Sequence, residues 1–200
     1  MVNACGVGGA AQSLEKLNTC AAFGLRILIE GDVACFRRPE FASDLVTYDV
    51  MPPTVASRLI GACLPGWPAR TTHVRVLKPI ARRWQTMRTA RGIKRCHVLE
   101  DVAYVLDVEV GPCAKRAASD IRALVAKADV HLGLSDFSAR VSLLDDGVPP
   151  SALDGTGAMD LGWMLYDLKS SRRSSPRFFR AVLRDGVMPI PPEMLAELAA

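Results

Sequence analysis

The order of strand-like and helix-like segments is the feature that most constrains this chain. β-forming residues dominate residues 25–36, 74–80, 98–110 and 130–144. Apolar residues recur at helical spacing in two further stretches, from Thr54 to Cys63 and from Lys115 to Ala128. Over the first 130 residues this predicts the order βαββαβ, which is the split-βαβ plan of ferredoxin-like domains. We therefore expect an α+β fold.

Breaks in the pattern divide the chain into three expected regions. Residues 1–24 contain several glycines and predict a weakly docked N-terminal extension. Residues 25–144 form the expected ferredoxin-like domain, with a basic β-hairpin over 78–97. Residues 145–200 form a small C-terminal β-rich region.

Several local patterns give finer expectations. Gly31-Asp32 interrupts the first strand and suggests a bulge. The apolar run 160–167 predicts a buried strand, and 178–183 a short helix or strand. Asp185-Gly186 predicts a turn, and 193–200 a terminal helix.

Composition predicts a globular protein without disulfide bonds, structural metals or cofactors. The chain has 200 residues, and 50% of them are hydrophobic, so a sizeable core is expected. The six cysteines are widely spaced, with no C-x-x-C pair, which predicts reduced, mostly buried thiols in a cytoplasmic protein. We expect no bound metal or other cofactor, including at Asp145-Asp146. No segment has the pattern of a secretory signal or a membrane span.

The distribution of charge is more informative than the net charge of +4. Two runs, Lys78–Arg95 and Lys169–Arg184, contain 13 of the 25 Lys and Arg residues and no acid. Arginine outnumbers lysine in both runs, which suits contacts with phosphates and bases. The runs therefore favour a nucleic-acid partner, and a solvated surface is the alternative. In the first run, Trp84 either stacks on a base or anchors the hairpin to the core.

Three segments of the chain match the sequence pattern of one family, in the same order as in that family. The first is Ala34–Phe41 followed by Thr47–Ala56. The second is Val74–Ile80 completed by Leu99–Tyr104. The third is Asp160–Asp167 with Phe178–Val187 behind it. Together they resemble the CRISPR-associated Cas five family, RAMP-superfamily subunits of type I Cascade complexes, and the subtype I-C branch in particular.

The resemblance implies a subunit that grips the 5′ handle of the CRISPR RNA and caps the backbone of RAMP subunits. Its implied partners are the CRISPR RNA, the RAMP backbone subunit, the Cascade large subunit and, through the complex, target DNA; no membrane is implied. The hairpin between Lys78 and His97 would insert between the RNA and a neighbouring subunit.

In the subtype I-C branch the subunit is usually also a metal-independent endoribonuclease for precursor CRISPR RNA. The resemblance implies a tyrosine at the end of the first helix and a Lys-His pair at the start of the second. Here the tyrosine position falls near Leu64-Pro65, the lysine is Lys115, and the histidine position is Arg116. Leucine and proline cannot carry a proton, and arginine is an improbable base at neutral pH.

Two other family motifs also differ in this chain. Trp-Lys-Pro is replaced by Gly66-Trp67-Pro68, and Leu-Gly-x-Arg-Glu by Leu132–Asp136. We therefore expect a binding subunit without chemistry of its own. The alternatives are an endoribonuclease with a rearranged site around Lys115, Arg116 and His97, and an assembly protein whose RNA contacts are incidental.

The residues expected to contact RNA are mostly cations of the two basic runs and of the family segments. They are Arg37, Arg38, Tyr48, Arg58, Lys78, Arg82, Arg83, Trp84, Arg88, Arg91, Lys94, Arg95, His97, Lys115, Arg116, Arg172 and Arg173. For Tyr48 the alternative is a packed ring with a hydrogen-bonded hydroxyl.

Overall fold

The computed structural model describes residues 22–41, 44–89, 92–112, 119–145, 147–167, 176–191 and 194. Residues 1–21 of the expected N-terminal extension lie outside the described residues. The first strand begins at Phe23, within the last residues of that expected extension. The expected terminal helix also lies outside the described residues, apart from Met194. Among the described residues, no helix has both the length and the apolar composition needed to span a bilayer.

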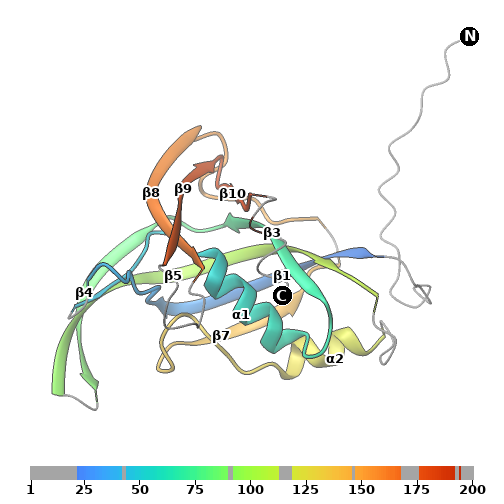
Figure 1. Ribbon diagram of the computed structural model, residues 1–200, viewed down its shortest axis with the longest axis horizontal. Coiled ribbons are helices and arrows are strands. Elements are labelled where there is room, and N and C mark those ends of the chain that lie inside the picture. Colours follow the sequence, from blue (N-terminus) through green and yellow to red (C-terminus); the bar gives the residue numbers. More distant parts are fainter. Residues whose placement is uncertain are drawn as a thin grey trace, which may run out of the picture.

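Ten strands form one sheet within the described part of the chain (Figure 1). Its central strands have the order β7-β1-β5-β3, and each neighbouring pair is antiparallel. They are β1 (Phe23–Ala34), β3 (Ala69–Val76), β5 (Gly92–Val110) and β7 (Ser138–Leu143), to which β6 (Val130–His131) adds at one edge. Each predicted strand region overlaps one of these strands, so the expected α+β class is confirmed.

Two helices cover one side of this sheet (Figure 1). α1 (Pro53–Cys63) packs on β3 and contacts α2 (Asp120–Lys127), which packs on β7. The inward stripe of α1 comprises Ala56, Leu59, Ile60 and Cys63, the spacing of an amphipathic helix. The predicted helices therefore exist, although α2 is described only from Asp120. Cys35, Cys63 and Cys96 are buried free thiols, as expected, whereas Cys5, Cys20 and Cys113 lie outside the described residues.

β5 is much longer than its neighbours because it serves two structures in turn. Its second half pairs with β1 and β3, and its first half pairs with β4 (Ala81–Thr89) to form a hairpin. Where the partner changes, Asp101 has a positive φ of 47°. The short β2 (Leu45–Val46) runs parallel to β5 beside Cys96 and His97. The predicted hairpin is thus a direct continuation of a core strand.

The C-terminal region extends the same sheet beyond β3. β10 (Val187–Pro189) pairs with β3 and is followed outward by β9 (Arg177–Arg184) and β8 (Ala158–Asp167). The prediction that 160–167 is a buried strand is only half right. Met164, Leu165 and Tyr166 are buried, but Trp163 on the same strand is 63% exposed. The segment 178–183 is strand, and Asp185-Gly186 is the expected turn.

The bulge expected at Gly31-Asp32 is wrong. The pairing of β1 with β5 keeps one register on both sides of this dipeptide. Gly31 has a packing role instead, because a Cβ atom there would overlap the side chain of Leu132.

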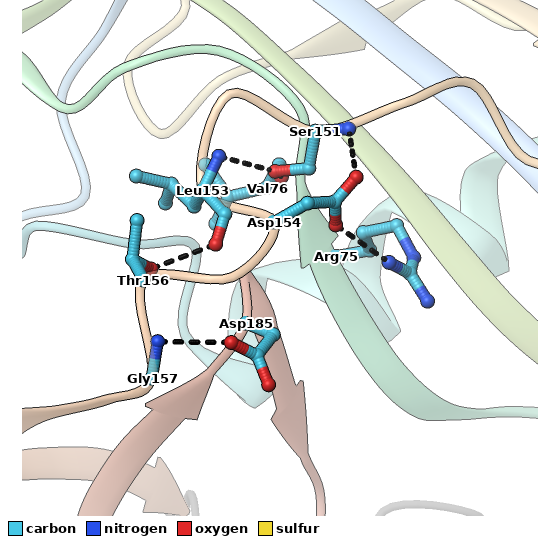
Figure 2. A network of polar contacts seen from close by, with 8 residues as sticks. All are labelled: Arg75, Val76, Ser151, Leu153, Asp154, Thr156, Gly157 and Asp185. Carbon is cyan, nitrogen blue, oxygen red and sulfur yellow. Dashed lines mark hydrogen bonds and ion pairs between the residues drawn. The ribbon is translucent and has the colours of Figure 1, made fainter.

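A polar network holds the C-terminal region against the end of β3 (Figure 2). The Ser151 hydroxyl donates to the Val76 carbonyl at 2.6 Å and accepts from the Leu153 N–H at 2.9 Å. Asp154 accepts from the Ser151 N–H at 2.8 Å. Asp185 accepts from the Gly157 N–H at 2.9 Å. The network therefore anchors both the 145–157 connection and the β9–β10 turn where β3 leads into the hairpin.

The Leu132-Gly133 dipeptide explains one family motif in physical terms. The Cys35 N–H donates to the Leu132 carbonyl at 3.0 Å, which brings the two backbones together. Gly133 has φ +95°, and a Cβ atom there would overlap the carbonyl oxygen of Cys35. Only glycine satisfies both conditions.

We predict that Gly133→Ala lowers the free energy of unfolding by about 3 kcal/mol or more, because a left-handed φ and a backbone overlap combine. Urea denaturation followed by circular dichroism measures the change. Gly155→Ala is the matched control, since Gly155 has φ +73° but open space around it, and it should cost about 1 kcal/mol. Equal costs for the two variants would contradict the packing explanation.

Candidate nucleic-acid interface

The hairpin of β4 and β5 has two chemically different faces. Side chains alternate along each strand, and directly opposite residues share a face. The pairs Trp84–His97, Thr86–Arg95 and Arg88–Ile93 therefore lie on one face. We call this the Trp84 face, and it comprises Trp84, Thr86, Arg88, Ile93, Arg95 and His97.

The Trp84 face is the solvent-facing one. Ile93 is 70% exposed and Trp84 is 49% exposed, whereas Cys96 and Val98 on the opposite face are fully buried. Arg88 and Arg95 are also exposed. Figure 1 shows the hairpin reaching away from the helices. The Trp84 face is therefore available to a partner without rearrangement of the core.

Cations at the base of the hairpin are neutralised by acids from neighbouring segments. The pairs are Lys78–Asp101, Arg82–Asp49 and Arg83–Glu100. The hydrogen bond that Arg82 donates to the Asp49 carboxylate at 2.8 Å raises the pKa of Arg82. These cations are held in the fold, and the Lys78–Asp101 pair lies where β5 changes partners. Within the described residues, neither Arg88 nor Arg95 has an acidic partner, so uncompensated charge concentrates toward the hairpin tip.

Trp84 lies across two residues of the opposite strand. Its ring centroid is 4.8 Å from that of His97, with 41° between the ring planes. The Arg95 guanidinium carbon lies 4.6 Å from the same indole centroid. The ring is thus held on the hairpin by a cation–π contact and an aromatic contact. The anchoring interpretation and the base-stacking interpretation of Trp84 are therefore compatible.

Tyr48 is buried and links distant segments. It is 1% exposed, and its hydroxyl accepts from the Leu165 N–H at 3.2 Å and donates to Glu40 at 3.5 Å. Burial raises the pKa of Tyr48 to about 12. Arg38 lies over the Tyr48 ring at 5.1 Å and pairs with Glu40 at 3.0 Å. The packed-ring alternative is the one observed, and Tyr48 cannot touch RNA from this position.

The other predicted contacts are dispersed or outside the described residues. Arg37 is exposed beside the Thr47 bridge, and Arg58 donates to the Gly133 carbonyl at 3.4 Å. In the second basic run, Arg180 pairs with Asp160 at 2.5 Å and holds the pKa of that carboxyl low. Arg91, Lys115, Arg116, Arg172 and Arg173 lie outside the described residues.

Charges near the far end of β5 are also paired. Arg26 and Asp107 are cross-strand partners with a 3.2 Å contact, and Arg70 and Glu109 make one of 2.7 Å. This part of the sheet offers little net positive charge. The Trp84 face is therefore the better candidate surface for a polyanion.

Comparison with known proteins identifies the family. The family model described as CRISPR-associated protein (Cas_Cas5) matches residues 24–191. The chain belongs to the Cas5 family. This confirms the resemblance derived from the three sequence segments, including its subtype I-C branch.

Two curated relatives of this Cas5 chain carry the name CRISPR pre-crRNA endoribonuclease Cas5d. The one from Mannheimia succiniciproducens is 30% identical, over 84% of this chain and 95% of the relative. The one from Thermus thermophilus is 28% identical, over 87% and 94%. Two solved structures share the fold at 17% identity: a CRISPR-associated protein, with a TM-score of 0.68 over 90% of this chain and 97% of that one, and a functionally uncharacterized Streptococcus mutans protein, with 0.66 over 88% and 96%.

The Cas5 fold separates the hairpin from the end of α1. Leu64 is the C-cap of α1, and the Gly111 N–H donates to the Pro68 carbonyl at 2.7 Å, close to the end of β5. His97 lies thirteen residues before Val110 on that strand, which is roughly 40 Å along it. Lys115 and Arg116 lie outside the described residues, so a site that joins them to His97 stays a prediction.

Sequence reasoning missed two kinds of residue in this Cas5 chain. The acids that neutralise the hairpin base, Asp49, Glu100 and Asp101, were not foreseen, because their pairing depends on strand register. Ile93 at the exposed tip was also missed, although a β-branched residue between cations on a hairpin was a visible signal.

We predict that Tyr48→Phe lowers the free energy of unfolding by about 1–2 kcal/mol at neutral pH, because the Leu165 N–H loses its acceptor. The raised pKa of Tyr48 means that the fold favours the neutral phenol. Its contribution is complete below about pH 10, the usual tyrosine pKa, and is lost as the pH rises toward 12. Urea denaturation at about pH 8, 10 and 11 covers the range below, at and above the usual tyrosine pKa. Between these values the free energy of unfolding should fall less in the variant than in the wild type. The same alkaline loss in both proteins would contradict this role.

Proposed function

We propose that this Cas5 chain binds the 5′ handle of the CRISPR RNA and caps the RAMP backbone of a type I-C-like Cascade. The observation that carries the proposal is the Trp84 face, a solvent-facing surface with exposed Arg88 and Arg95 and no acidic residue. Family membership supplies the class of ligand. Contacts to the large subunit and, through the complex, to target DNA are part of the same proposal.

We propose that the central sheet is a ferredoxin-like RAMP domain. The strand order β7-β1-β5-β3, with α1 between β1 and β3 and α2 between β5 and β7, supports it. In this assignment β4 and the first half of β5 are the basic hairpin, and β8, β9 and β10 are the C-terminal extension.

Cleavage of precursor RNA is the second candidate function, and the names of the two curated relatives favour it. The ends of the described segments around Leu64 and Pro68 and around Gly111 meet at one end of the sheet, so the family's catalytic positions can converge there. However, Leu64 is 1% exposed and apolar, and it has no proton to exchange. We therefore place binding first.

We predict that replacing Arg88 and Arg95 together by alanine weakens binding of repeat RNA and flattens its salt dependence. Loss of two phosphate contacts to a single strand lowers the slope of log affinity against log salt by about 1.4. Fluorescence anisotropy at a series of salt concentrations measures both quantities.

The control for this test removes the same charge elsewhere. Arg26→Ala with Arg70→Ala also deletes two arginines, but both are paired with acids away from the hairpin. This double variant should keep the wild-type slope. Identical slopes in the wild type and in both double variants would refute hairpin binding.

We predict that the purified chain does not cut repeat RNA in the presence of a chelator. The reason is that Leu64 and Pro65 replace the tyrosine and Arg116 replaces the histidine of the family motif. Denaturing gel electrophoresis of end-labelled repeat RNA provides the measurement. A product ending at the repeat handle that disappears with Lys115→Ala would instead establish the enzyme.

A further inference from the structure

We propose that the outer face of the Trp84 indole is a stacking site for one unpaired base of the bound RNA. The proposal rests on the RNA-binding function above and adds a specific contact to it. Trp84 lies directly opposite His97 and diagonally to Arg95, and it contacts both. Both contacts come from β5, and the residue remains 49% exposed.

The neighbours of Trp84 hold the ring before any ligand binds. An indole fixed by Arg95 and His97 loses little conformational freedom when a base stacks on it. Within the described residues, the buried Nδ1 of His97 has no hydrogen-bond partner. The contact of His97 with Trp84 is made by its ring, whose centroid lies 4.8 Å from that of the indole.

The rest of the Trp84 face suits a single strand rather than a duplex or a protein core. Arg88 is exposed farther toward the tip, on the same face. Uncompensated arginines beside an exposed aromatic ring are the combination that binds single strands, with cations on phosphates and the ring on a base. An acidic protein could also pair with the arginines, but membership of the Cas5 family and the names of the curated relatives favour RNA as the partner.

The test is a double-mutant cycle between Trp84 and individual nucleotides. Repeat RNA is prepared with an abasic nucleotide at each position in turn, and its affinity for the full chain is measured by anisotropy at fixed salt. We expect one position at which the abasic change weakens wild-type binding by about 5- to 150-fold. Trp84→Ala should cause a similar loss with intact RNA, and almost no further loss with that abasic RNA. Trp84→Phe should retain part of the affinity.

Trp163→Ala is the matched control. Trp163 is the other strongly exposed tryptophan among the described residues, and it lies on β8. This variant should bind intact RNA like the wild type and lose affinity normally with the abasic RNA. The salt slope of Trp84→Ala should equal that of the wild type, because no phosphate contact is removed.

The outcomes separate the two proposals. If the wild type binds RNA but every abasic loss persists in full in Trp84→Ala, the stacking site is refuted and the binding function stands. If the wild type binds no repeat RNA, both fail. A lower thermal midpoint of Trp84→Ala, without coupling to any nucleotide, would assign the ring to hairpin stability alone and would also refute the stacking site.

Discussion

Continuity of β5 is the constraint on which the rest of the structure depends. One strand pairs with β1 and β3 at the centre of the sheet and then with β4 in the hairpin. The hairpin is therefore joined to the core by a continuous strand and not by a loop. Asp101, with its positive φ, lies where the partner of β5 changes, and the Lys78–Asp101 contact of 2.5 Å lies at the same point. A surface built this way is presented with little freedom to lose when a partner binds.

The charge pattern shows how a strand register alters the meaning of a sequence run. Lys78–Arg95 contains no acid, yet its first three cations are paired, because β5 and the segment before α1 bring acids to them. Arg180 in the second run meets Asp160 of β8 in the same way. Among the described residues of the hairpin, Arg88 and Arg95 remain without an acidic partner. A basic run therefore predicts a polyanion surface only after neighbouring strands have been placed.

Local patterns predicted most of the fold but little of what depends on distant contacts. Alternating β-formers and the helical stripe of Leu59 and Cys63 located the strands and α1, since these signals are carried by adjacent residues. The exposure of Trp163 could not be predicted, because it depends on which parts of β8 the rest of the fold covers. The need for glycine at Gly133 was likewise hidden, since the carbonyl that excludes a Cβ belongs to Cys35. Trp84, Arg88, Arg95 and His97 of the Trp84 face were predicted contacts, but Ile93 was not. Lys94 pairs with Met87 on the opposite face, and only the register of the hairpin separates it from the others.

The length of β5 also separates two parts of the described chain. The hairpin lies at one end of the strand, and the Gly111–Pro68 contact, four residues after Leu64, lies near the other end, beyond Val110. Trp84 contacts Arg95 and His97 within the hairpin, whereas Leu64 is buried at the end of α1. The side chain at Leu64 can therefore change without altering these contacts of Trp84. RNA binding by the hairpin, as proposed above, does not depend on the side chain at that position.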